Sequence, residues 1–163
     1  RDRDIPVVMD VMSHDLDIVL NVVNSNIKKI RASGVEVLGN SPDIVHAVVE
    51  FDNGCVANLT ASRVSLTNER VTKFYQKDAH IIIDYYKQKT SLYKLKTNGK
   101  TEIHSEELVI NKENPIKREL EEFGQSILED TTPTVGILDG AKMLEAAFRV
   151  AEKVKKTTSL IED

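Results

Sequence analysis

Two carboxylates and a histidine near the start of the sequence are the residues best suited to proton transfer. Asp10 and His14 are four residues apart, and Asp17 follows His14 by three, so on a helix the three side chains can share one face. A carboxylate near an imidazole fixes its tautomer and raises its basicity, as a general base requires. The alternative is a structural role, with an acidic helix start that suits the helix dipole and a histidine at the edge of the core.

The other residues able to bind a ligand are scattered. His46, His80 and His104 fall on separate predicted strands and form neither H-x-H nor H-E-x-x-H, so we expect no metal site. Arg63 could bind an anionic group of a substrate or serve as a surface ion-pair partner. The sequence has no G-x-G-x-x-G, P-loop or G-x-S-x-G motif, so we expect this chain to contain no cofactor-binding residues.

Composition indicates one soluble domain. The chain has 163 residues, of which 40% are hydrophobic and 29% charged, enough to bury a core without disulfides or metals. Its net charge of −4, with basic and acidic residues interspersed, argues against nucleic acid as a partner, and no apolar run is long enough to cross a membrane. A single cysteine, Cys55, is compatible with a reducing compartment, and we expect a cytoplasmic protein.

Apolar residues at helical spacing predict a first helix from Asp10 to about Asn24. Between Ile27 and Ile110 the spacing changes to two, which predicts an antiparallel meander. The predicted strands cover residues 27–38, 44–51, 55–62, 71–76, 79–86, 91–96 and 100–104. The expected turns are Asn53-Gly54 (type I′ or with a nearby bulge), Lys77-Asp78 and Asn98-Gly99, and Ser33-Gly34 is an expected break within the first strand.

Two helices should close the chain. Pro115 marks the start of one whose apolar face contains Leu120, Phe123, Ile127 and Leu128 and which Pro133 ends; the last begins near Gly136. We therefore predict an α+β fold: an open, mainly antiparallel β-sheet with helices packed on one face.

Both faces of that sheet should be partly apolar. The residues that indicate this lie on predicted strands and include Val48, Phe51, Val56, Ile81, Ile83 and Tyr85. A large exposed apolar face usually meets a partner. We expect a homo-oligomer through the open sheet face.

Four segments, in order, resemble the Gfo/Idh/MocA oxidoreductases. The stretch from Val8 to Asp17 is similar to the D-x-x-x-H segment that opens the family's C-terminal domain. Residues 48–59 resemble its F-x-N-G hairpin, Ala61-Ser62-Arg63 follows in place, and residues 134–154 resemble its closing P-x-V-x-x-x-D-G-x-x-x-L-x-x-A helix. The resemblance covers nearly the whole chain.

The resemblance implies an NAD(P)-dependent oxidoreductase of which residues 1–163 are the single C-terminal domain for substrate binding and oligomerisation. The Rossmann domain that binds NAD or NADP, and the Glu-Lys-Pro motif, would lie upstream of Arg1, so the fragment alone should be inactive. His14 would be the catalytic histidine, and Asp10 would bind the substrate and orient it, with Arg63 as a further substrate contact. Pro6 to Met9 replace the family's usual glycines, as in sugar-nucleotide members, which supports a sugar or sugar-nucleotide substrate.

Two alternatives remain open at this point. The chain could be a non-catalytic binding or dimerisation module, in which residues 10–17 are only an acidic helix start. It could also be a family relative that uses the fold as a structural or sensor subunit. The presence of a cofactor domain and of sugar turnover in the intact protein would separate them.

Overall fold

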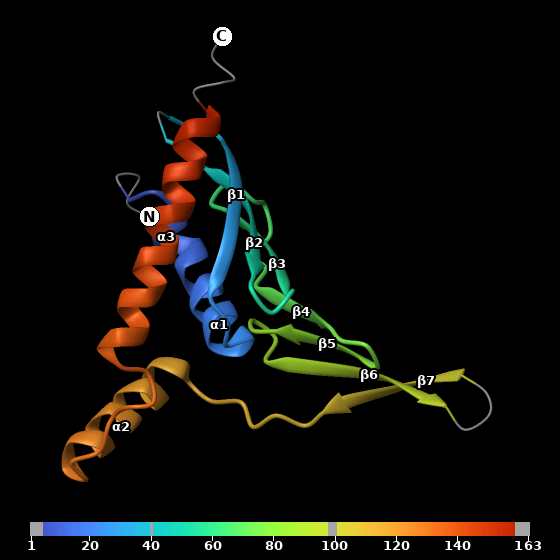
Figure 1. The fold of residues 1–163 in the computed structure, drawn as a ribbon. Helices are drawn as coiled ribbons and strands as arrows, with labels where there is room; N and C mark the ends of the chain where they lie inside the picture. Colours follow the sequence, from blue (N-terminus) through green and yellow to red (C-terminus); the bar gives the residue numbers. More distant parts are fainter. Residues whose placement is uncertain (1–4, 40, 98–100, 159–163) are drawn as a thin grey trace. The chain divides into compact units, whose positions relative to one another are not determined.

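The structure is a computed structural model that describes residues 5–39, 41–97 and 101–158. Figure 1 labels the α-helices and the strands. The elements in chain order are η1 (Val8–Met12), α1 (Ser13–Val23), β1 (Ile27–Val35), β2 (Ile44–Phe51), β3 (Val56–Ser62), β4 (Val71–Tyr75), β5 (Ala79–Asp84), β6 (Lys89–Thr97), β7 (Thr101–Leu108), α2 (Pro115–Leu128) and α3 (Ile137–Thr158). The contacts divide the chain into unit 1, residues 1–65 and 132–163, and unit 2, residues 66–131.

The predicted α+β class is confirmed, and every strand pair in the described ranges is antiparallel. The strands do not form one ladder, however. They pair as a three-stranded sheet, β1-β2-β3, in unit 1 and a four-stranded sheet, β4-β5-β6-β7, in unit 2. The expectation of one continuous meander is therefore corrected, because hydrophobic alternation identifies strands but does not specify which neighbours they pair with.

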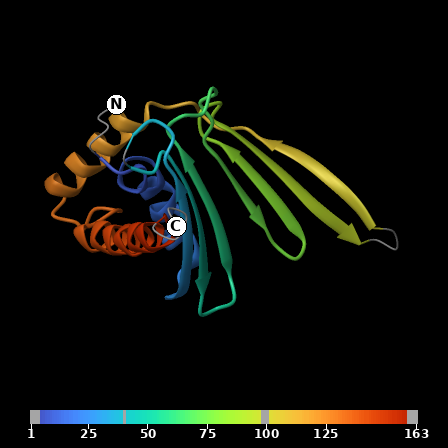
Figure 2. The same cartoon turned by 90° about the horizontal axis from the view of Figure 1, so that it is seen from above.

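Unit 1 has its core between the sheet and two helices. Helices α1 and α3 lie on the same face of the β1-β2-β3 sheet, as Figure 2 shows. Strand β2 alternates as predicted, so Val45, Ala47, Val49 and Phe51 point into the core. These β2 side chains share the core with apolar residues of the helices. The N-terminal helices contribute Met12, Leu16 and Val19, and α3 contributes Ala146, Ala147, Val150 and Val154. Phe51 thus lies on the face that the helices cover.

The hairpin between β2 and β3 forms where Asn53-Gly54 predicted it. Gly54 has φ +87°, whereas Asn53 is not among the residues with positive φ. The Gly54 N–H donates to the Phe51 carbonyl at 3.1 Å, and the Phe51 N–H donates to the Cys55 carbonyl at 2.9 Å. A type I′ turn needs positive φ at both central residues, so this is a turn followed by a glycine bulge, the second of the predicted options.

Gly34 does not interrupt β1, which continues through Ser33 and Gly34 to Val35. A Cβ placed on Gly34 would lie 2.7 Å from Val154 Cγ1 of α3 and 2.8 Å from Pro42 Cβ. The glycine therefore lets helix α3 approach the strand closely, and the predicted break was wrong because this requirement comes from tertiary packing.

We expect Gly34→Ala to lower the free energy of unfolding of unit 1 by about 1–3 kcal/mol, because the new methyl group overpacks the contact between β1 and α3. Gly124 in α2 is the matched control, since nothing lies within 4 Å of a Cβ built there. Gly124→Ala should instead stabilise α2 by about 0.5–1 kcal/mol through helix propensity. Urea denaturation of both variants measures the difference; equal effects would contradict the close-approach argument.

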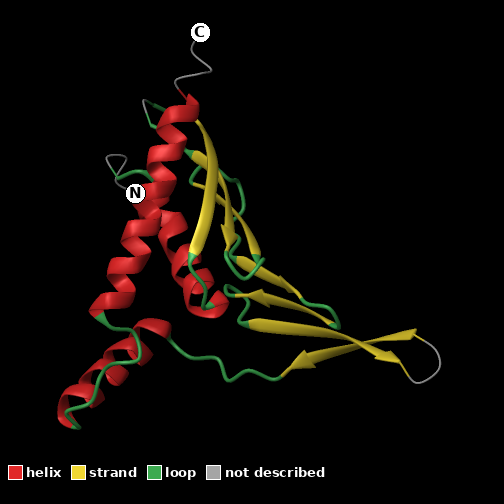
Figure 3. Ribbon diagram, viewed as in Figure 1, coloured by secondary structure: helices red, strands yellow, loops and turns green. Residues whose placement is uncertain are grey.

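Unit 2 consists of the four-stranded sheet followed by one helix, and Figure 3 shows the strands preceding α2. The predicted turn at Lys77-Asp78 joins β4 and β5, while the turn predicted at Asn98-Gly99 lies outside the described residues. In the sheet, β6 and β7 pair from Thr90 with Leu108 onward, so β7 runs beyond the predicted end at His104.

Helix α2 starts as predicted but ends earlier. The Asn114 side chain caps it by accepting from the Ile116 and Lys117 N–H groups, and Pro115 occupies the first turn. Asp130 adopts a left-handed φ of +53°, and the Thr131 N–H donates to the Ser126 carbonyl at 2.9 Å. This Schellman-type ending stops the helix at Leu128, before Pro133 is reached. Its predicted apolar face is exposed, with Leu120 at 65%, Phe123 at 55% and Ile127 at 65%.

Candidate active site

The candidate site is built on a wide helical turn that leads directly into α1. Val8–Met12 forms a π-helix, and the Ser13 N–H donates to the Val8 carbonyl, five residues back. A π-turn holds more residues than an α-turn, so Val7 and Met12 both reach the core. The Ser13 hydroxyl donates to the Met9 carbonyl at 2.8 Å. In an α-helix this carbonyl would accept the Ser13 N–H, which here donates to Val8 instead. Such turns are frequent at functional sites.

The predicted acid–base pair projects from this helix. Asp10 follows the buried Val8 by two positions, and His14 follows the buried Met12 by two, so both side chains turn away from the core. His14 is exposed and Asp10 is half-buried. An imidazole on a rigid helix, accessible from outside the unit, can accept a proton from a bound substrate.

Asp17 is anchored along the helix. Its Oδ1 accepts from Asn21 Nδ2 at 3.1 Å, and its carbonyl accepts from the same amide at 2.9 Å. The carboxylate is therefore tied to the next turn of α1. This contact fits the structural reading of Asp17 better than a role in catalysis.

Arg63 is buried, not on the surface. Its side chain is 8% exposed and its Nε lies 3.7 Å from Oδ1 of Asp43, whose side chain is 7% exposed. Its Nη2 donates to the Ile5 carbonyl at 2.6 Å, and the Arg63 N–H donates to the Asp43 carbonyl. Asp43 Oδ2 in turn accepts the N–H groups of Val37 and Leu38. The guanidinium thus joins the start of the chain to the loop before β2.

Two of the other histidines have a polar or an aromatic neighbour on the adjacent strand. His46 Nδ1 lies 2.9 Å from Thr60 Oγ1 on an exposed part of β2 and β3, and His80 stacks on Tyr75 in unit 2 at 4.3 Å between ring centroids. Across the residues that the structure describes, no three His, Cys, Asp or Glu side chains are arranged to hold a metal ion. No helix in the described ranges is long and apolar enough to cross a membrane.

The sequence analysis did not predict a concave region that lies wholly within unit 2. Its cavity of about 680 Å³ is lined by residues including Arg70, Tyr85, Tyr86 and Arg118. The adjacent tyrosines at the end of β5 were the available signal, but Arg70 and Arg118 are far apart in the sequence, and only folding brings them to one cavity.

The family model of the GFO/IDH/MocA C-terminal domain matches residues 5–82. This match and the α+β fold show that the chain resembles the C-terminal domain of the Gfo/Idh/MocA oxidoreductases.

Among individual proteins, the chain is similar to UDP-N-acetylglucosamine 3-dehydrogenase of Acidithiobacillus ferrooxidans. The two are 28% identical over 158 residues, which are 95% of this chain and 50% of that enzyme. A solved structure of that dehydrogenase matches with a TM-score of 0.87 over 94% of this chain and 49% of its own. Levoglucosan dehydrogenase in complex with NADH matches with a TM-score of 0.78 at 14% identity, over 93% of this chain and 48% of its own, and shows the shared fold. The chain spans about half the length of these relatives.

Proposed function

We propose that this chain is the substrate-binding half of an NAD(P)-dependent dehydrogenase that acts on a sugar nucleotide of the UDP-N-acetylhexosamine type. The observation that carries the proposal is the similarity to UDP-N-acetylglucosamine 3-dehydrogenase, which extends over 95% of the chain at 28% identity. The exposed His14 on the π-to-α helix supports it, because the imidazole is accessible to a substrate hydroxyl.

His14 is the proposed general base. As the substrate carbinol becomes a carbonyl, the hydroxyl proton moves to the His14 imidazole, and in the reverse direction the imidazolium returns it. Asp10 is proposed to bind the sugar and to keep the imidazole oriented, with its half-buried carboxylate one helical turn earlier.

A bound nicotinamide would supply the hydride acceptor for the carbinol carbon, while the hydroxyl oxygen on that carbon gives its proton to His14. The residues of this chain do not fit a dinucleotide site, because the sequence has no G-x-G-x-x-G turn. We therefore propose that NAD or NADP is bound by an N-terminal Rossmann domain, with residues 1–163 as the domain that follows it. The chain alone should then be inactive.

Arg63 is proposed as a further substrate contact. Its Nε is buried and has no hydrogen-bond partner in the described ranges, although Asp43 lies nearby. The Nε is inaccessible to a substrate, so the contact would use the guanidinium N–H groups that Ile5 does not occupy. The buried ion pair with Asp43 would hold the guanidinium in place for that contact.

We also propose a cytoplasmic homo-oligomer that joins through an open sheet face. In unit 1 the face of β2 away from the helices contains Ile44 and Val48, and the neighbouring Val35 and Val56 are 52% and 53% exposed. Their apolar surface would be covered by a second copy.

The test is turnover by the whole protein. UDP-N-acetylglucosamine is offered with NAD⁺ and, separately, NADP⁺, and reduction is followed by nicotinamide absorbance. We expect turnover with at least one cofactor and none from the 163-residue chain alone. Absence of turnover with any UDP-sugar would contradict the proposal and favour the non-catalytic binding module.

A further inference from the structure

The cavity of unit 2 has the size and lining of a ligand site. Its volume is about 680 Å³, within the range of about 300–1,000 Å³ typical of small-molecule pockets. It lies between the turn that joins β5 to β6 and the segment that leads into α2. Its wall combines basic and aromatic side chains, among them Arg70, Tyr85, Tyr86, Lys89 and Arg118.

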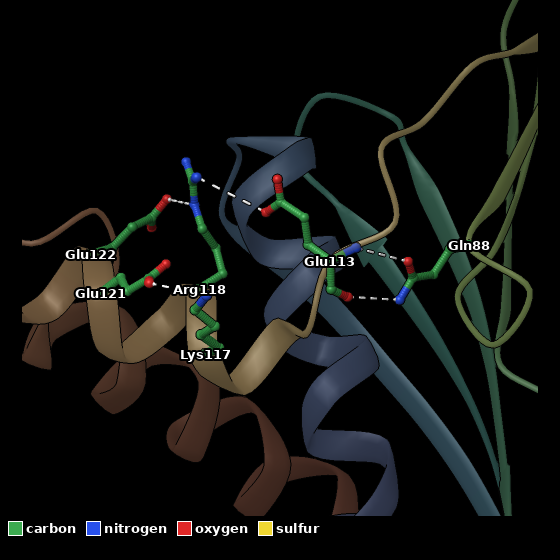
Figure 4. A network of polar contacts seen from close by, with 6 residues as sticks. All are labelled: Gln88, Glu113, Lys117, Arg118, Glu121 and Glu122. Carbon is green, nitrogen blue, oxygen red and sulfur yellow. Dashed lines mark hydrogen bonds and ion pairs between the residues drawn. The ribbon is translucent and has the colours of Figure 1, made fainter.

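A pair of hydrogen bonds holds the two sides of this cavity together. Gln88 Nε2 donates to the Glu113 carbonyl at 3.0 Å, and the Glu113 N–H donates to Gln88 Oε1 at 3.2 Å (Figure 4). Gln88 makes this double contact from a left-handed backbone, with φ +49°, which a non-glycine residue seldom adopts. Strained residues of this kind persist where surrounding contacts fix them, and they concentrate at ligand sites.

The basic groups on the wall carry fixed positive charge. Arg118 donates a hydrogen bond to the Glu122 carboxylate and Lys89 donates one to the Glu107 carboxylate, and these contacts raise the pKa of both basic groups. Arg118 uses its Nε for the Glu122 carboxylate at 2.8 Å, while its Nη1 lies 4.0 Å from a Glu113 oxygen. A guanidinium has five N–H donors, so its terminal nitrogens retain donors for a phosphate.

The aromatic groups supply flat surfaces beside these charges. The Arg70 guanidinium lies 5.1 Å from the centroid of the Tyr85 ring, in cation–π geometry. Tyr86, the next residue along the chain, is 62% exposed. Aromatic rings and arginine planes are the platforms on which nucleic-acid bases stack, and arginine is the preferred partner of phosphate.

We propose that the unit 2 cavity binds a nucleoside diphosphate group, with the phosphates at Arg118 and Arg70 and the base against the tyrosines. Charge alone would suit any small anion, and aromatic rings alone would suit many apolar ligands. Their combination in one cavity of nucleotide size favours a ligand that contains both an anionic chain and a planar ring. The group could belong to a nucleotide sugar or to a free nucleotide. The choice of uridine as the base to be tested rests on the proposed function.

The test is calorimetric titration of the whole protein with UDP, UMP and uridine, with NAD⁺ or NADP⁺ saturating to fill a dinucleotide site elsewhere. We expect affinity to rise with each phosphate. Arg118→Gln and Tyr86→Leu should each raise the Kd for UDP by about tenfold or more. Both side chains are exposed enough for the fold to tolerate these changes, which circular dichroism will confirm.

Arg31→Gln is the matched control, because Arg31 is also an exposed, ion-paired arginine, bound to Glu50 in unit 1. It should leave the Kd for UDP unchanged. A Kd that does not change in Arg118→Gln and Tyr86→Leu, or changes equally in Arg31→Gln, would overturn the proposal.

Turnover separates the two sources of the nucleotide. If the KM for UDP-N-acetylglucosamine rises together with the Kd for UDP, the cavity binds the nucleotide part of the substrate. If only the Kd for UDP changes, the cavity binds a free nucleotide. A protein that binds UDP in this cavity but turns over no UDP-sugar would support the proposed nucleotide site and contradict the proposed function. The two proposals can therefore fail separately.

Discussion

His14→Ala in the whole protein is expected to lower kcat of the proposed dehydrogenase reaction by about 10²- to 10⁴-fold, the range typical of the loss of a general acid–base group. The reason is that the substrate hydroxyl proton would have no positioned acceptor as the carbonyl forms. His14 is exposed and lies outside the buried core, so the thermal midpoint should change little. Steady-state turnover followed by nicotinamide absorbance measures the effect.

His46→Ala is the matched control for this prediction. His46 is an exposed histidine of the same unit, hydrogen-bonded to Thr60 on β2 and β3, and it has no proposed role in the reaction. Its replacement should leave kcat within about twofold of the wild-type value, because a surface substitution away from the reacting groups usually has a small effect. Turnover by His14→Ala at the wild-type rate would remove the assignment of the general base, whatever the substrate proves to be.

Phe51→Ala should have the largest effect on stability among core truncations, about 3–5 kcal/mol lower free energy of unfolding for unit 1. Phe51 is 2% exposed at the end of β2 and belongs to the cluster that joins the sheet to α1 and α3. Its removal leaves a cavity that the neighbouring strands and helices cannot close without moving. Urea denaturation followed by circular dichroism measures the loss.

Phe123→Ala provides the comparison with the same change in chemistry. Phe123 lies on α2 and is 55% exposed, so its replacement should cost less than about 1 kcal/mol. Similar losses at the two positions would mean that the Phe123 face of α2 is covered in the folded protein. A small loss at Phe51 would contradict the packing of unit 1.

The elements of this fold could largely be read from the sequence because their signals are local. Alternation gave β2 with the bounds of the structure, Ile44–Phe51, and Asn53-Gly54 located the hairpin that follows it. Asn114 and Pro115 produce a capped helix start at the predicted place. Each of these features depends on backbone geometry and side-chain period within a few residues, so no distant part of the chain has to be known.

Where prediction failed, the deciding contact came from elsewhere in the fold. Gly34 reads as a strand break, yet it allows α3 to approach β1. The early end of α2 is the exception, because the left-handed Asp130 that stops this helix before Pro133 is a local feature of the chain. The partition of the strands into two ladders depends on pairing, and hydrophobic alternation does not encode pairing.

The sequence by itself determined the α+β class and the positions of most strands and helices, because residue types and spacing are local properties of the chain. The roles of Asp10 and His14, which rest on the family resemblance, stay a prediction. Tertiary structure alone decided that Arg63 is buried against Asp43, since these residues meet through the fold and not through sequence spacing. It also decided that Arg70, Tyr85 and Arg118 line one cavity. Side chains that are distant in sequence share a site only after the strands have paired and the turns have set the direction of the chain. Strand pairing and helix packing depend on contacts between residues far apart in sequence, which local patterns do not specify.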